Sequence, residues 1–108
     1  MRCLMGFLDL FKKVNINEAV AQCRENGAIL LDVRTKEEFS EGHIEGAINL
    51  PLNRITQAEQ SIPLDAPVFV YCLSGARSAQ AVSILKEMGY ENARNIGGIS
   101  QWKGNVVR

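Results

Sequence analysis

Short apolar runs alternate along this chain with segments of helical periodicity, and no other feature of the sequence restricts the fold as strongly. The runs at residues 28–33, 46–52 and 66–72 have the length and composition of strands that are covered on both faces. A fourth strand is predicted at residues 92–98. Because strands that alternate with helices form parallel sheets with helices on both sides, we predict an α/β fold.

Capping signals mark where the helices between these strands begin. Residues 15–27 are predicted to form a helix with Asn17 as its N-cap. Thr35 and Glu38 have the spacing of a capping box, which predicts the start of a second helix. The remaining helical segments are predicted at about residues 52–60, 78–89 and 99–103.

Composition excludes several classes of protein. A chain of 108 residues forms one domain with a single core. The apolar fraction of 46% and the charged fraction of 22% are ordinary for a globular protein. Since 12 lysines and arginines balance 12 aspartates and glutamates, we expect no basic face that would bind nucleic acid. Composition leaves the oligomeric state open.

Residues 1–13 are predicted to form an apolar leader, and residues 14–108 a single domain. The apolar stretch of the leader is interrupted by Asp9 and is followed by no small-residue cleavage site. A membrane span needs about 20 apolar residues, so we expect no integral membrane segment. We favour a leader that packs on its own domain or on a second copy, with a docking or membrane-surface helix as the alternative. The native start, at Met1 or Met5, is left open.

The loop after residues 66–72 carries the strongest chemical signal. Cys72 ends the clearest predicted strand, at the edge where parallel sheets bind ligands. The loop then leads into a helix N-terminus, whose free N–H groups attract negative charge. Gly75 allows successive N–H groups to converge, and Ser74 and Ser78 add hydroxyl donors. A cysteine that faces these donors is expected to have a lowered pKa and to act as a thiolate nucleophile.

Arg77 is the one charged residue between positions 66 and 85, so it needs an anionic partner. The candidates are a carboxylate from elsewhere in the fold and an anion bound at Cys72. We favour the anion, and a surface salt bridge is the alternative. For Cys72 the alternative to a reactive thiol is a small buried side chain at a strand end.

The three cysteines, Cys3, Cys23 and Cys72, match neither a disulfide framework nor a zinc-binding pattern. We expect free thiols in a reducing compartment, and therefore a cytoplasmic protein without a metal site. Cys23 lies on the apolar face of its predicted helix and is expected in the core. Cys3 is expected to be an exposed bystander, with a role as a resolving thiol left open.

Three segments of the chain carry a family resemblance. They are LLDVRTKEEFSEGHIEGAINLPL at residues 30–52, VYCLSGARS at residues 70–78 and NIGGISQW at residues 95–102. In order and spacing they resemble the rhodanese-like domain, a family of thiosulfate and persulfide sulfurtransferases, over residues 14–103. The resemblance implies a small doubly wound sheet of about five mostly parallel strands with helices on both faces. It also implies a short first strand near residues 14–16.

The resemblance implies an enzyme that transfers sulfur. Cys72 would take a sulfane sulfur from thiosulfate or a persulfide donor and become a persulfide, and Arg77 would bind the small anionic donor and stabilise charge. Cyanide, a thiol or a partner protein would then remove the sulfur, and no metal or organic cofactor would be needed. The loop residues that would bind the sulfur are Leu73, Ser74, Gly75, Ala76 and Ser78.

Further residues have supporting roles by this resemblance. Asp32 and Arg34 reach the same carboxyl edge as Cys72 and would brace the site, with direct catalysis less favoured. His43, the only histidine, would be structural and would satisfy backbone groups. Trp102 would pack near the rim of the site.

Other functions remain as alternatives to an enzyme with full turnover. One is a sulfur-carrier, delivery or interaction module with little turnover of its own, and another is an inert structural module. Phosphatase chemistry is disfavoured because four residues lie between Cys72 and Arg77, one fewer than in tyrosine phosphatases and arsenate reductases. The shorter loop suits a single sulfur atom better than a tetrahedral oxyanion.

Overall fold

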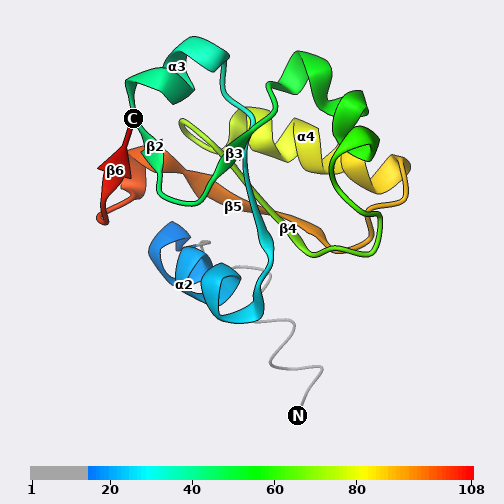
Figure 1. Ribbon diagram of the computed structural model, residues 1–108, viewed down its shortest axis with the longest axis horizontal. Helices are drawn as coiled ribbons and strands as arrows, with labels where there is room; N and C mark the ends of the chain where they lie inside the picture. Colours follow the sequence, from blue (N-terminus) through cyan, green and yellow to red (C-terminus); the bar gives the residue numbers. More distant parts are fainter. Residues whose placement is uncertain (1–14) are drawn as a thin grey trace.

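A computed structural model describes residues 15–108 and has a central parallel sheet (Figure 1). Within these residues the sheet has four strands in the order β3-β1-β4-β5, and every neighbouring pair is parallel. The strands are β1 (Ile29–Asp32), β3 (Ile48–Asn49), β4 (Val68–Cys72) and β5 (Ala93–Gly98). The predicted α/β fold with a parallel sheet is confirmed.

Helices cover both faces of this sheet (Figure 1). Helix α2 (Ile16–Asn26) lies on one face, and helix α4 (Ala76–Glu87) lies on the other with the 3₁₀ helix η1 (Leu52–Gln60). The predicted doubly wound arrangement therefore holds. The remaining elements are α3 (Lys36–Glu41), η2 (Ile99–Gln101) and an antiparallel pair formed by β2 (His43–Ile44) and β6 (Val106–Val107).

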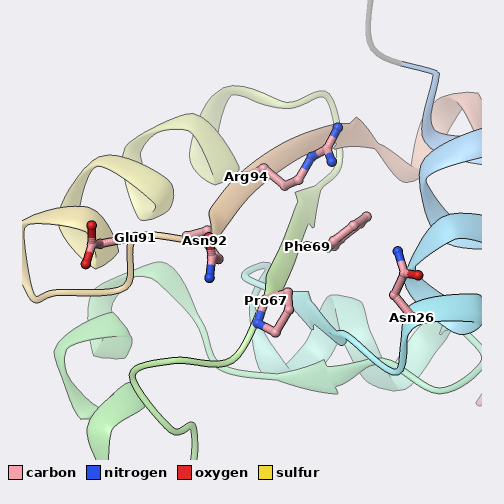
Figure 2. A pocket seen from close by; sticks show the side chains of 7 residues that line it. Asn26, Pro67, Phe69, Glu91, Asn92 and Arg94 are labelled. Carbon is pink, nitrogen blue, oxygen red and sulfur yellow. The ribbon is translucent and has the colours of Figure 1, made fainter.

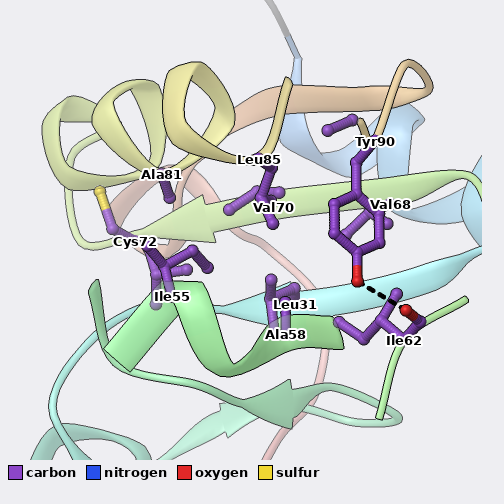
Figure 3. Close-up of a cluster of buried hydrophobic side chains, with 12 residues drawn as sticks. Leu31, Ile55, Ala58, Ile62, Val68, Val70, Cys72, Ala81, Leu85 and Tyr90 are labelled. Atoms are coloured by element: carbon purple, nitrogen blue, oxygen red, sulfur yellow. Dashed lines mark hydrogen bonds between the residues drawn. The ribbon is translucent and has the colours of Figure 1, made fainter. Parts of the chain in front are cut away.

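Strand β4 is apolar along its whole length because both of its faces are buried. Val68, Val70 and Cys72 pack against α4 and η1, in the cluster drawn in Figure 3. Phe69 and Tyr71 point to the opposite face and pack with α2. Each such apolar side chain stabilises the fold by about 1.5–3 kcal/mol when fully buried. Because alternate side chains lie on opposite faces of the sheet, β4 stabilises both clusters. Burial of β4 on both faces explains why residues 66–72 form a continuous apolar run.

The start of α2 differs from the prediction. Its N-cap is Asn15, whose side-chain oxygen accepts a hydrogen bond from the Asn17 N–H at 2.9 Å, so the prediction of Asn17 was wrong. Asn17 instead contacts the C-terminal segment, where its Oδ1 accepts from the Lys103 N–H at 2.8 Å. The implied strand near residues 14–16 is wrong for Ile16, which is the first residue of α2. The Ile16 side chain is buried in the same cluster as the other apolar residues of this helix.

The other predicted elements form with small changes in length. Thr35 and Glu38 make the predicted capping box of α3, with hydrogen bonds in both directions. The strand predicted at residues 46–52 has two ladder residues. Val14 and the predicted leader, with Cys3, lie outside the described residues. Within residues 15–108, no helix combines the length and the apolar character that crossing a bilayer requires.

Candidate active site

Strand β4 and helix α4 together place Cys72 at the floor of a tight loop. The Cys72 side chain is 1% exposed, and its sulfur points toward the first turn of α4 (Figure 3). The Gly75 N–H donates to Sγ at 3.0 Å, and the Ser78 hydroxyl lies 3.4 Å from Sγ. Gly75 has a φ of 106°, a left-handed conformation that favours glycine, and this conformation turns its N–H toward the sulfur.

Hydrogen-bond donors decide the acidity of the Cys72 thiol. Burial by itself would raise the pKa, but donors from Ser78, Gly75 and Ser74 outweigh burial and bring the pKa of Cys72 below its ordinary value of 9.0. Cys23 provides an internal comparison, because it is also buried and its sulfur faces the Ala28 carbonyl at 3.4 Å. There burial raises the pKa of the thiol. The pKa values of the two buried cysteines are therefore shifted in opposite directions, because only Cys72 has several hydrogen-bond donors that stabilise a thiolate.

The loop residues predicted to bind sulfur surround Cys72 in two ways. Leu73, Ser74 and Ala76 are exposed at the mouth of the loop, while Ser78 is fully buried beneath it. Two hollows flank the loop. The one beside Arg77 has a volume of about 370 Å³, and the one beside Ser74 about 640 Å³.

A further hollow lies at the opposite edge of the sheet (Figure 2). It has a volume of about 510 Å³ and lies near Pro67 and Ala93, where β4 and β5 begin. Arg94 lies over the Phe69 ring on this side, with 5.0 Å between the guanidinium carbon and the ring centroid. Because Cys72 ends β4, this hollow is separated from the thiol by the length of the strand.

Arg77 pairs with a carboxylate rather than with an anion at Cys72. Its two terminal nitrogens donate to the Glu38 oxygens at 2.7 and 3.0 Å, and the two side chains are 34% and 29% exposed. The structure therefore contains the surface salt bridge that was the alternative for Arg77. The capping box fixes Glu38 at the start of α3, and the fold brings this carboxylate to Arg77, a placement that no local sequence signal reveals. Contact between Arg77 and a sulfur donor stays a prediction.

The Arg77–Glu38 pair predicts a dependence of stability on pH. Hydrogen bonds from Arg77 lower the pKa of Glu38 from 4.5 to about 2. Because the folded-state pKa lies below the unfolded value, the pair stabilises the fold above pH 4.5, and this contribution is lost as the pH falls toward 2. In urea unfolding, the difference in unfolding free energy between wild type and Glu38→Gln should shrink over this range. Glutamine keeps the capping box, and Glu37→Gln, exposed on the same helix, is the control. A difference that stays constant with pH would contradict the assignment.

Asp32 and Arg34 form a buried ion pair at the end of β1. Asp32 accepts hydrogen bonds from the Arg34 N–H at 2.8 Å and from its guanidinium at 2.7 Å. Arg34 also donates to the Gly42 carbonyl at 2.7 Å and so ties the end of β1 to the end of α3. The Asn49 amide donates to the carbonyls of both residues, which adds β3 to the same junction. This geometry fits the predicted supporting role.

His43 and Trp102 have packing roles, and a place for Trp102 near the rim of the site stays a prediction. The His43 ring stacks on Phe39 with 3.6 Å between ring centroids, and its Nδ1 lies 2.8 Å from the Phe39 carbonyl oxygen. Trp102 packs against the α2 cluster, and its Nε1 donates to the Asn105 carbonyl at 2.9 Å. Within residues 15–108, no three histidine, cysteine, aspartate or glutamate side chains come together as a metal site would require.

Asn95 is a site residue that the sequence analysis missed. Its Oδ1 accepts from the Ser78 hydroxyl at 2.7 Å and from the Gly97 N–H at 3.0 Å. Its Nδ2 donates to the Gly75 carbonyl at 3.1 Å. Asn95 thus ties β5 to the Cys72 loop. The available signal was an amide side chain in the middle of a predicted strand.

The Cys72 thiol lies between a strand of a small parallel sheet and the first turn of a helix, where the Gly75 N–H donates to its sulfur. The family model "Rhodanese-like domain" matches residues 15–105, and the chain belongs to this family. It is 40% identical over 80 residues to the protein YqhL of Bacillus subtilis. The matched segment covers 73% of this chain and 64% of YqhL. The chain therefore spans less than two thirds of that relative.

Two further comparisons extend over most of both chains. The chain is 33% identical over 94 residues to "Thiosulfate sulfurtransferase GlpE" of Pseudomonas entomophila, covering 86% of this chain and 85% of the relative. Among solved structures, "rhodanese with anions from E. coli" is 36% identical with a TM-score of 0.68, and the match covers 75% of this chain and 98% of that structure. Both relatives carry rhodanese-type names.

Proposed function

We propose that this protein is a rhodanese-type sulfurtransferase in which Cys72 carries the sulfur as a persulfide. The observation that carries the proposal is the Cys72 sulfur itself, which receives the Gly75 N–H at 3.0 Å at the start of α4 and has a pKa below its ordinary value. The names of the relatives support the same reaction class.

In the first step the Cys72 thiolate attacks the sulfane sulfur of the donor. A bond forms between Sγ and that sulfur, and the bond between the sulfane sulfur and the rest of the donor breaks. The electron pair leaves with the donor residue, which is sulfite when the donor is thiosulfate. Charge is conserved because the negative charge moves from Sγ to the outer sulfur of the persulfide.

The loop would then hold the charged outer sulfur. Backbone N–H groups at a helix N-terminus bind anions, and a site already built from such donors needs little rearrangement during the reaction. The residues proposed to form this binding loop are Leu73, Ser74, Gly75, Ala76 and Ser78. Arg77 is proposed to assist as a nearby cation, with Glu38 as its partner in the resting state.

In the second step an acceptor removes the outer sulfur. Cyanide or a thiolate attacks it, the bond to Sγ breaks, and the electron pair returns to Cys72 as thiolate. Proposed acceptors in a cell are thiols or a partner protein. We also propose a cytoplasmic location, because within the described residues Cys23 and Cys72 are free thiols that a reducing compartment would preserve. The division into a leader at residues 1–13 and a domain at residues 14–108 stays a prediction.

Intact mass spectrometry after incubation with thiosulfate tests the proposal. Wild type should gain the mass of one sulfur atom, and cyanide should remove it. Cys72→Ser should show no gain, while Cys23→Ser should load normally because Cys23 lies in the α2 cluster. An adduct that persists in Cys72→Ser, or a wild type that loads with neither thiosulfate nor a persulfide donor, would contradict the proposal.

One observation favours a delivery module as the second candidate. Leu73, the residue next to Cys72, is 48% exposed, and an apolar side chain at the mouth of the loop suits contact with a partner protein. Turnover separates the two functions. An enzyme consumes thiosulfate and cyanide over many cycles, whereas a delivery module loads one sulfur and then waits for its partner.

A further inference from the structure

The Ser78 hydroxyl has more acceptors within reach than it has protons. The Asn95 Oδ1 lies 2.7 Å from Ser78 Oγ, the Gly75 carbonyl oxygen 3.1 Å and the Cys72 sulfur 3.4 Å. A hydroxyl group donates a single hydrogen bond, so these three contacts cannot all be made at once. The hydroxyl of the fully buried Ser78 can therefore donate to only one of the three acceptors at a time. The shortest of the three contacts is the one to Asn95.

The neighbours of Asn95 fix which of its amide atoms faces Ser78. The Gly97 N–H requires an acceptor, which is Oδ1 at 3.0 Å, and the Gly75 carbonyl requires a donor, which is Nδ2 at 3.1 Å. A flipped amide would lose both bonds, so Oδ1 stays toward Ser78. The register of β4 and β5 shifts here, from Val70 opposite Asn95 to Tyr71 opposite Gly97. Such bulges redirect side chains beside active sites.

Two acceptors therefore compete for the Ser78 proton, since the Gly75 carbonyl already has the Asn95 amide. When the Cys72 sulfur is uncharged, as a thiol or as the inner sulfur of a persulfide, the amide oxygen is the better acceptor. When the sulfur is a thiolate, a charge-assisted hydrogen bond is the stronger one. If the hydroxyl turns to the sulfur, Oδ1 keeps the Gly97 N–H, so no acceptor is left without a partner.

We propose that Asn95 is a positioning residue that holds the Ser78 hydroxyl while the Cys72 sulfur is uncharged and releases it to the sulfur when the thiolate forms. This role rests on the sulfur-transfer function proposed above. Loading moves the negative charge from Sγ to the outer sulfur, and the hydroxyl then returns to Asn95. The hydroxyl rotates and keeps its proton, so the step transfers neither protons nor electrons.

The thiolate titration of Cys72 tests this role without any sulfur donor. The ultraviolet absorbance of the thiolate is followed against pH in wild type, Ser78→Ala, Asn95→Leu and the double variant. Each trace is corrected with the same protein carrying Cys72→Ser, which removes the signal of the other thiols. The charged side chains described at this end of the sheet are Arg77 on α4, Glu38 on α3, and Asp32 and Arg34 at the end of β1. They form two ion pairs, Asp32 with Arg34 and Glu38 with Arg77. Arg77 and Glu38 stay charged through the neutral pH range, because the pKa of Glu38 is about 2 and the pKa of Arg77 is raised.

The variants should move the midpoint in opposite directions. Ser78→Ala removes a donor to the thiolate and should raise the pKa of Cys72 by about one pH unit. Asn95→Leu removes the shortest competing acceptor and should lower the pKa. The decrease should be smaller than full release of the hydroxyl would give, because the Gly75 carbonyl, 3.1 Å away, loses the Asn95 amide and can then accept from Ser78. In the Ser78→Ala background, Asn95→Leu should have no effect. A raised pKa in Asn95→Leu, or an equal shift in both backgrounds, would overturn the proposal and leave Asn95 as a structural brace.

A second pair of variants serves if Asn95→Leu does not fold. The carboxylate of Asn95→Asp holds the hydroxyl more strongly than an amide, so the pKa of Cys72 should rise. The rise should be smaller with Ser78→Ala, where no hydroxyl is held, and an equal rise would overturn the proposal. The two proposals fail in different measurements. If the role of Asn95 is wrong, the thiolate titrations of the variants contradict it, whereas if the sulfur-transfer function is wrong, wild type titrates normally but does not load sulfur.

Discussion

Replacing Gly98 with alanine is expected to slow sulfur loading of Cys72 by on the order of 100-fold, the effect of displacing reacting groups by about an ångström. Gly98 lies opposite Cys72 in the register of β4 and β5. A Cβ at this position would lie 2.6 Å from the Ser74 Cα and closer still to the Leu73 carbonyl oxygen. Both atoms belong to the loop backbone, so the loop itself must move. The cause is lack of space rather than conformation, because φ at Gly98 is −127°.

Stopped-flow loading with thiosulfate measures this effect, and Gly46→Ala is the matched control. Gly46 has a φ of 93° and no atom within 4 Å of an added Cβ, so alanine there strains the backbone without touching the loop. It should lower the unfolding free energy by about 1–3 kcal/mol and leave loading unchanged. Loading of Gly98→Ala at the wild-type rate would show that the loop backbone tolerates displacement.

Asp32→Asn is expected to lower the free energy of unfolding by about 3–5 kcal/mol, because it leaves the buried Arg34 guanidinium without an anion. Asp32 is 0% exposed, and its carboxylate holds both the backbone N–H and the guanidinium of Arg34. Domains of this size have total stabilities of about 5–15 kcal/mol, so the loss is a large share. Urea unfolding monitored by Trp102 fluorescence measures the change.

The exposed ion pair provides the control for this prediction. Glu38→Gln breaks a pair whose side chains are 29–34% exposed, and it should lower the unfolding free energy by less than about 1 kcal/mol near neutral pH. Adding Arg34→Met to Asp32→Asn should recover part of the loss by removing the unpaired charge. Equal effects of Asp32→Asn and Glu38→Gln would mean that burial does not determine the strength of the Asp32–Arg34 pair.

Features that depend on neighbouring residues could be predicted from the sequence. The apolar run ending at Cys72 indicated a strand buried on both faces, and β4 packs into two cores. The spacing of Thr35 and Glu38 indicated the start of α3. Gly75 next to a helix start indicated converging N–H groups, and its N–H does donate to Cys72. The last two cases involve groups that are close in the chain, and the first depends only on the residue types of one short segment, so residue type and spacing are sufficient information.

Features that join distant segments could not be predicted in this way. The N-cap of α2 was misplaced because Asn15 and Asn17 are the same residue type. Contacts of Asn17 with the distant residues Gln101 and Lys103 give the two asparagines different roles. The ion pair of Arg77 with Glu38 could not be located because Glu38 lies in another element. Asn95 was missed because a register shift in β5 directs its amide to Ser78.

The sequence by itself therefore determined the strand and helix order, the edge of the sheet that carries Cys72 and the donors in its loop. Those properties follow from short-range periodicity, capping and backbone freedom. Tertiary structure decided which charges are neutralised and which hydroxyl faces the sulfur. The physical reason is that ion pairs and hydrogen bonds form within about 3 Å. Only the tertiary fold brings Glu38 of α3 to Arg77 and Asn95 of β5 to Ser78 within that distance.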